Sequence, residues 1–345
     1  MVRTRERQRN ADTTLGREAA TLGVSPTSEE RVRVHFDQRP PLPQIKLTDL
    51  PNRREPNPRV VVPLDGSELA ERALGVAEAL AVILTAPIHL LHVVDPAIPP
   101  ATRRDEAKQY LTDVATRFPH DLPVEMQVLE GDPVEELLHW LNGAERTIVA
   151  MSTHGRRGIP RVLFGSVADK VIRSAHVPVA VVRSARAQSR DIQHVLVPLD
   201  GSTLSASALP VAAMLAHPHR TIGLVRVVDD TRLRAGAALA YALTWSDPEL
   251  RADGAAHAKE AARSDLVITA ARLRNDGYRV SWEVRTGRPS DEIIRTAETT
   301  GADLIVMATH GWEGVRRWTF GSVTDEVVRR SQVPVVVVPS NNRFA

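Results

Sequence analysis

Two glycine-serine pairs have the residue types and spacing of a phosphate-binding loop. Gly165-Ser166 follows Gly155 after a spacer of nine residues, and Gly321-Ser322 follows Gly311 in the same way. Glycine lets the backbone approach a ligand closely, and the free N–H groups at the start of a helix favour an anion. We therefore expect at least one of these loops to bind phosphate.

A structural explanation of the same residues is a capping box at each helix start. Ser166 would pair with Asp169, and Ser322 with Asp325. In such a box the serine hydroxyl and the acidic side chain satisfy backbone N–H groups of the first turn.

Two aspartates, Asp65 and Asp200, stand in identical Pro-Leu-Asp-Gly-Ser segments directly after apolar runs. A carboxylate at the end of a strand can accept a hydrogen bond from a ribose hydroxyl, or hold a metal that bridges phosphates. The alternative is that the aspartate or the serine caps the helix that follows. The residues alone leave both interpretations open.

The elements that position these groups follow from hydrophobic patterning. Helices are expected after Leu69, over 105–118, from Pro133 and over 167–174. Short β-branched and apolar runs predict five strands: one beginning at Arg59, then 88–94, 124–129, 147–151 and 177–182.

The whole pattern then repeats. The matching strands of the second copy begin at His194 and cover 223–228, 280–284, 303–307 and 333–338. Asp200 follows Asp65 by 135 positions, whereas Gly311 follows Gly155 by 156, so the second copy holds about 21 extra residues. These fall between Asp229 and about Gly277, where we expect a longer second helix with a preceding loop.

Alternating strands and helices predict an α/β fold with a parallel sheet and helices on both faces. The carboxyl ends of all its strands then meet at one edge, where ligands of open α/β sheets bind. Asp65 and Gly155 both lie just past strand ends, so we expect them to share that edge.

Bulk properties narrow the class of protein. A chain of 345 residues suggests two domains, and a net charge of +2 does not demand a nucleic-acid partner. Cysteine is absent, which fits a cytoplasmic protein, and no apolar run approaches the ~18 residues of a membrane span. Residues 1–57 are polar and proline-containing, so we expect a flexible, disordered tail; an arm that touches a partner is the alternative.

Several common enzyme motifs are missing. The chain has no Gly-x4-Gly-Lys-Ser/Thr loop, no Gly-x-Gly-x-x-Gly after a strand, no Gly-x-Ser-x-Gly elbow and no His-Glu-x-x-His pair. It also lacks a recognisable set of general base and nucleophile. We therefore do not expect an enzyme with robust turnover, and at most weak ATP hydrolysis.

The combined motifs resemble a known family. Val-Pro-Leu-Asp-Gly-Ser, the His-Val-Val-Asp strand at 92–95, the Thr-His-Gly…Gly-Ser loop and the terminal Val-Pro-Val-x-Val-Val occur in order and in tandem. Together they are similar to the universal stress protein (UspA) domain, over about 58–185 and 192–340. The resemblance implies two tandem Rossmann-like domains of the adenine nucleotide hydrolase-like type, each with a five-stranded parallel sheet. It also implies pairing of domains through the last strand, here as an intramolecular pseudo-dimer or in a homo-oligomer.

The resemblance also implies a ligand. Family members that bind ATP carry Gly-x2-Gly-x9-Gly-Ser/Thr, and this chain departs from that pattern at the first glycine, which is Ser152 in one copy and Ala308 in the other. By the same resemblance, Asp65 and Asp200 would meet the ribose or a metal. Backbone groups of Val93 and Val227 would meet adenine, and Mg²⁺ would accompany the triphosphate.

Two functions from different classes follow. The first is a stress-associated cytoplasmic protein that binds adenine nucleotide and acts as a sensor or regulator. The second is a tandem scaffold that binds no nucleotide and acts through contacts with protein partners. Copurification of adenine nucleotide would distinguish them.

Overall fold

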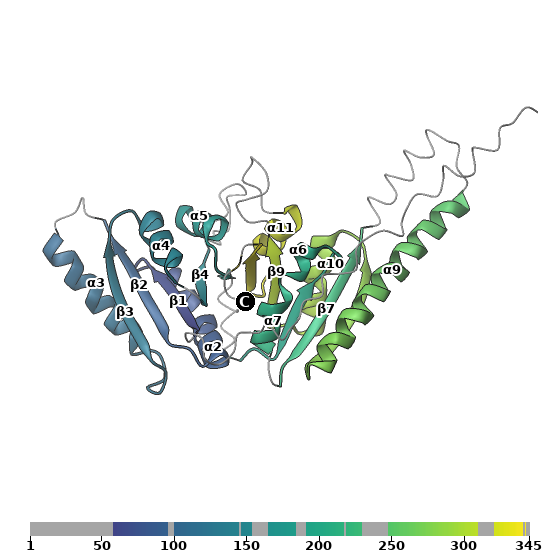
Figure 1. Cartoon of the computed structure of the whole chain (residues 1–345). Coiled ribbons are helices and arrows are strands. Elements are labelled where there is room, and N and C mark those ends of the chain that lie inside the picture. The colour runs from purple at the N-terminus through teal and green to yellow at the C-terminus, as the bar shows by residue number, and fades with distance from the viewer. Residues whose placement is uncertain are drawn as a thin grey trace, which may run out of the picture. The chain divides into compact units, whose positions relative to one another are not determined.

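Runs of valine, isoleucine and leucine form the strands of the computed structural model (Figure 1). Val60, Val61 and Val62 of β1 (Arg59–Leu64) are all fully buried. Successive residues of a strand point to opposite faces of the sheet, so both faces must be covered. The structure describes residues 58–95, 100–144, 146–153, 165–183, 191–216, 219–229, 248–309, 321–340 and 342.

The first copy alternates strands and helices. After β1 come the 3₁₀ helix η4 (Ala70–Ala73), α2 (Leu74–Leu84), β2 (Ile88–Val94), α3 (Pro100–Ala115), β3 (Val124–Glu130), α4 (Pro133–Asn142), β4 (Thr147–Ser152), α5 (Ser166–Ser174) and β5 (Val179–Val182).

The second copy repeats this order. Its elements are β6 (His194–Pro198), α6 (Thr203–Ala206), α7 (Leu209–Ala216), β7 (Thr221–Val228), α9 (Pro248–Asn275), β8 (Arg279–Thr286), α10 (Pro289–Thr300), β9 (Leu304–Thr309), α11 (Ser322–Arg330) and β10 (Val335–Pro339).

All these strands join one ten-stranded sheet in the order β3-β2-β1-β4-β5-β10-β9-β6-β7-β8. Neighbours within each copy are parallel, as expected from the βα alternation. The two copies meet at β5 and β10, which pair antiparallel. The expectation that the two terminal strands lie together is confirmed, and each strand covers an edge that would otherwise expose unpaired backbone groups.

Helices pack on both faces of the sheet. Leu80 of α2, Leu111 of α3 and Leu215 of α7 belong to the core on one face, together with Leu266 of α9. On the other face α4, α5, α10 and α11 supply the core, through side chains that include Leu137, Val171, Ile293 and Val327. The labelled ribbons in Figure 1 show this doubly wound arrangement within each copy.

The predicted elements agree with the observed ones apart from their ends. The first helix of the first copy begins as a 3₁₀ turn before α2, and α3 begins at Pro100 and ends at Ala115 rather than covering 105–118. The longer second helix of the second copy is confirmed, since α9 has 28 residues and α3 has 16. The predicted tail, 1–57, and the loop expected before α9, 230–247, lie outside the described residues, and the domain limits 58–185 and 192–340 stay a prediction.

Candidate functional site

The sheet reverses its strand order at one point in each copy. From β1 the chain moves outward to β2 and β3, then returns to β4 on the other side of β1. The register of β1 and β4 pairs Val60 with Ile148 and Val61 with Val149. The equivalent point in the second copy lies between β6 and β9. Ligands of open α/β sheets bind in the crevice outside the carboxyl ends of the strands at such a reversal.

The turn after β1 holds Asp65 at this edge. Its Oδ1 accepts hydrogen bonds from the Ser67 N–H at 3.0 Å and from the Ser67 hydroxyl at 2.6 Å. The Ser67 Oγ in turn accepts from the N–H of Ala70 at 3.1 Å. Gly66, between them, has φ of +82°, a backbone conformation that glycine adopts without strain. The structure therefore gives the capping role to the serine, while Asp65 orients it and stays exposed to solvent.

The turn after β6 repeats this arrangement. Asp200 Oδ1 accepts from the Ser202 N–H at 2.8 Å and from the Ser202 hydroxyl at 2.5 Å, and Ser202 caps α6 by accepting from Ser205 N–H. Burial opposes ionisation of Asp200, but the hydrogen bonds from Ser202 and Ser205 and the charge of Arg226 together lower its pKa below the ordinary value. Asp200 is therefore a carboxylate at neutral pH.

The helices that follow the glycine loops begin without a side-chain cap. Gly165 is the N-cap of α5 and Gly321 that of α11, and among the described residues neither N-cap makes a side-chain hydrogen bond to its helix start. The Asp169 carboxylate instead accepts from Arg173 Nε at 2.9 Å, one turn along the helix. The capping-box alternative is therefore wrong for Ser166, which is the first helical residue. The free N–H groups and the positive end of the helix dipole favour an anion at such a helix start.

The threonines at the ends of β4 and β9, Thr153 and Thr309, were not among the predicted site residues, whereas the neighbouring Ser152 was. Thr153 is fully buried, and its Oγ1 has no hydrogen-bond partner among the described residues. The same holds for the buried Oγ of Ser152 and the Oγ1 of Thr309. Most buried polar groups have a partner, so unpaired hydroxyls at a ligand edge suit a polar ligand. A hydroxyl residue directly after an apolar strand is the sequence signal that could have found them.

Some of the remaining predicted site residues lie within the described residues, and others lie outside them. Val93 and Val227 are penultimate residues of β2 and β7, and both pack partly buried against the core of the α4 and α10 face. Ala308 is next to last in β9, and its carbonyl accepts from the Thr324 hydroxyl at 3.3 Å. Gly155 and Gly311 lie outside the described residues. Asp65, Val93 and Ser152 thus end three adjacent strands at one edge, as do Asp200, Val227 and Ala308.

A series of contacts between polar side chains runs from this edge of the first copy toward α2. The ring of His92 lies 5.8 Å from that of Tyr110, edge to face, and the Tyr110 hydroxyl donates to Glu71 at 3.1 Å. Burial lowers the pKa of His92, although the charge of Asp65 acts in the opposite direction. Burial, followed by the nearby Glu71 carboxylate, raises the pKa of Tyr110 well above its usual value. His92 is therefore neutral at pH 7 and Tyr110 is a hydrogen-bond donor.

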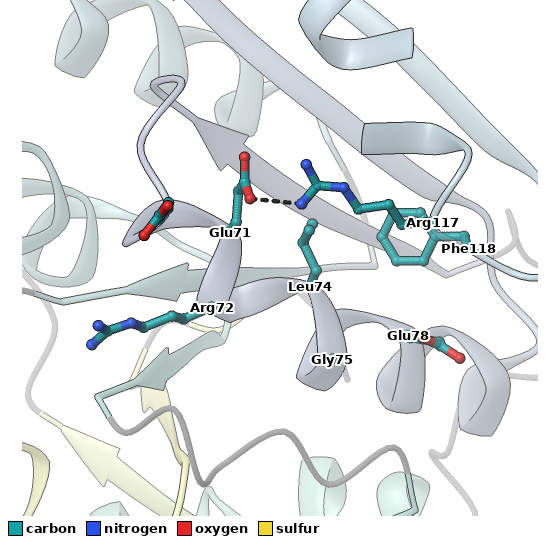
Figure 2. Close-up of a pocket in the computed structure, with 8 residues that line it drawn as sticks. Glu71, Arg72, Leu74, Gly75, Glu78, Arg117 and Phe118 are labelled. Carbon is teal, nitrogen blue, oxygen red and sulfur yellow. Dashed lines mark hydrogen bonds and ion pairs between the residues drawn. The ribbon is translucent and has the colours of Figure 1, made fainter. Parts of the chain in front are cut away.

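A pocket of about 260 Å³ lies beside α2, at the Glu71 end of this series of contacts. Figure 2 shows Arg117 reaching across it to Glu71, with an N–O distance of 2.6 Å. The pocket is also lined by Glu68, Arg72, Leu74, Gly75, Glu78 and Phe118. It contains none of the residues predicted to bind nucleotide, so it does not locate the candidate site.

Two features are absent from the residues that the structure describes. No group of three or more histidine, aspartate or glutamate side chains is arranged to hold a metal ion within these ranges. In the same part of the chain no helix has the length and apolarity needed to cross a bilayer.

Comparison with known proteins identifies the family. The family model described as Universal stress protein family matches residues 56–183 and again 191–339, which together cover most of the chain. The chain belongs to the universal stress protein family. The tandem repeat seen in the sequence is therefore a pair of universal stress protein domains, and the resemblance inferred from the motifs is confirmed.

One relative matches most of this chain and almost all of its own length, whereas another matches only part of this chain. Universal stress protein Rv2005c of Mycobacterium tuberculosis is 30% identical over 302 residues, which cover 81% of this chain and 96% of the relative. Universal stress protein MJ0531 of Methanocaldococcus jannaschii is 28% identical over 141 residues, or 37% of this chain and 83% of that protein.

Solved structures confirm the Rossmann-like universal stress protein fold. The crystal structure of a universal stress protein from Archaeoglobus fulgidus matches with a TM-score of 0.63 at 21% identity, covering 83% of this chain and all of that one. A putative universal stress protein from Pseudomonas aeruginosa matches with a TM-score of 0.54 at 17% identity, covering 83% and 94%.

Proposed function

We propose that this universal stress protein binds an adenine nucleotide, ATP, at the carboxyl edge of its sheet and acts as a stress-linked sensor or regulator. One observation carries the proposal. The point of strand reversal coincides with a solvent-exposed carboxylate on one side, Asp65, and an uncapped helix start on the other, at Gly165. These are the two groups that ribose and phosphate need.

The described residues fit such a ligand. The unpaired hydroxyls of Ser152 and Thr153 offer hydrogen-bond donors at the end of β4. A triphosphate at this edge would find backbone N–H groups from α5, hydroxyls from β4 and a ribose acceptor in Asp65.

Mg²⁺ would enter with the triphosphate rather than occupy a protein site of its own. Magnesium is typically held by one or two carboxylates together with substrate phosphates, and it keeps several waters. Asp65 and Asp200 each keep one oxygen, Oδ2, that accepts no hydrogen bond from the described residues. That oxygen is the group we propose to meet either the ribose or the metal.

Regulation, rather than catalysis, is the role that these groups support. Hydrolysis needs a group that orients or deprotonates the attacking water. Among the described residues at this edge, His92 is packed edge to face against Tyr110, and the free Oδ2 of Asp65 is the oxygen that we propose to meet the ribose or the metal. Nucleotide occupancy at this edge would instead be the state that a partner senses.

The test is to release and identify any small molecule that copurifies, and then to titrate ATP by calorimetry with and without Mg²⁺. Binding with a Kd below ~1 mM supports the proposal. If no adenine nucleotide copurifies or binds at millimolar concentration, the scaffold function replaces it, and Ser152 and Ala308 would be the residues to change to glycine first.

A further inference from the structure

The two copies differ at one position of the carboxyl edge of the sheet, where nucleotide binding is proposed and which is called the nucleotide edge below. His92 of β2 pairs across the sheet with Val128, and Arg226 of β7 pairs with Val284, so the two residues are equivalent by register. Each lies one residue before the valine proposed to meet adenine. The first copy therefore has a neutral imidazole where the second has a guanidinium.

The partners of these residues are exchanged as well. His92 packs on Tyr110 of α3, while Arg226 forms an ion pair with Asp265 of α9. Tyr110 and Asp265 are equivalent, because each directly precedes a leucine, Leu111 or Leu266, that is buried in the same core. An aromatic contact in one copy is thus replaced by an ion pair in the other.

The Arg226 guanidinium occupies space beside the turn that carries Asp200. A Cβ built on Gly201 would lie 2.5 Å from Nη1 of Arg226 and 2.7 Å from its Nη2. A Cβ built on Gly66, the equivalent glycine of the first copy, would meet no atom within 4 Å. The guanidinium therefore lies against the backbone of the turn that carries Asp200, whereas the turn that carries Asp65 is open.

Arg226 is buried and already paired. The residue is only 9% exposed, and its Nη1 already donates to Asp265. Its charge also acts on Asp200. A nucleotide bound against this turn would meet the guanidinium, and displacing it would leave the half-exposed Asp265 without its partner, a cost that the first copy does not impose.

We propose that Arg226, held by Asp265, closes the nucleotide edge of the second copy, so that the first copy is the binding site of the chain. The proposal rests on the proposed function and specifies which of its two sites works. Arg226 is then a specificity-determining residue. The first domain binds nucleotide, and the second domain pairs with it through β10.

The experiment is a calorimetric titration of the full chain with Mg-ATP at neutral pH. The parent should bind about one nucleotide per chain. Gly165→Val, which blocks the first copy, should reduce its affinity at least about tenfold, whereas the matched Gly321→Val should leave it unchanged. The pair Arg226→His with Asp265→Tyr, which copies the first domain into the second, should raise the stoichiometry to about two.

The reverse exchange puts the residues of the second copy into the first copy, and the unfolding temperature shows whether that variant is folded. His92→Arg with Tyr110→Asp should close the first copy and reduce binding at least about tenfold, in a protein whose unfolding temperature shows that it is folded. Two equal sites in the parent, or weaker binding in Arg226→His with Asp265→Tyr, would overturn this inference while leaving nucleotide binding intact. No binding by any variant would instead refute the proposed function itself.

Discussion

Ala180 of the first domain pairs with Val336, its own equivalent in the second. On either side Val179 pairs with Val337 and Val181 with Val335, so the register is symmetric about the central pair. An antiparallel pairing of equivalent residues is the local signature of a twofold axis. The two domains of one chain therefore meet at this strand pair as the two subunits of a symmetric dimer would.

A charged side chain placed in this strand pair should lower the stability of the protein. Val181 is 2% exposed, so Val181→Asp buries a carboxylate without a partner, and we expect a loss of about 3 kcal/mol or more in the free energy of unfolding. Val82→Asp is the matched control, because Val82 is 59% exposed and should change stability by about 0.5 kcal/mol or less. Urea unfolding of both variants measures the difference, and equal stabilities would show that β5 is not buried against β10.

The start of α4 offers a second measurement. Asp132 caps this helix, and its Oδ1 accepts from the N–H groups of Val134 and Glu135 at 2.9 and 3.0 Å. Asp132→Ala should destabilise the protein by about 1 kcal/mol. The equivalent residue before α10, Arg288, makes no side-chain cap, so Arg288→Ala should cost clearly less in the same unfolding assay. A larger effect of Arg288→Ala would contradict the assignment of the caps.

The titration of His92 tests the geometry of the first nucleotide edge. Burial lowers its pKa and the charge of Asp65 partly restores it, so Asp65→Asn should lower the pKa further. NMR titration of the imidazole resonances measures this, and Asp200→Asn is the control because no histidine stands at the equivalent position of that domain. An unchanged or raised pKa in Asp65→Asn would place Asp65 away from His92.

The depressed pKa of His92 also predicts how stability depends on pH. The unfolded state takes up a proton near the ordinary value of 6.5, whereas the folded state does so only at lower pH. The stability that neutral His92 contributes is therefore complete above 6.5 and is lost as pH falls from there toward the folded pKa. His89, whose pKa burial also lowers, acts in the same direction. Replacing His92 with Gln should make stability less dependent on pH between about 5 and 7.

The Gly321 substitution used to probe nucleotide binding should leave the fold intact. Gly321 has φ of −50° and no atom within 4 Å of a built Cβ, so Gly321→Val should change the unfolding temperature by less than about 2 °C. Gly301 is the contrast, because its φ of +65° at the end of α10 is unfavourable for a branched residue. Gly301→Val should destabilise by about 1 kcal/mol or more. A strongly destabilised Gly321→Val would remove it as a binding probe.

The sequence by itself determined the elements, their order and the family. Valine-rich strands such as β1 and β10, the turn residues Gly66 and Gly201, and the tandem repeat are local patterns. Each depends on side-chain size, branching and backbone freedom within a few residues. Helix ends were less well predicted, because whether Ser166 is an N-cap or the first helical residue depends on the path of the preceding loop.

Only the tertiary structure decided what surrounds the candidate residues. Arg226 and Asp265 are separated by 39 positions, and no local pattern indicates that their side chains meet over Gly201. The burial of the Thr153 hydroxyl likewise depends on the packing of β4 against distant segments. Two turns with the same letters, Asp-Gly-Ser, therefore have different surroundings, because space and charge at a site are set by residues that reach it from other parts of the chain.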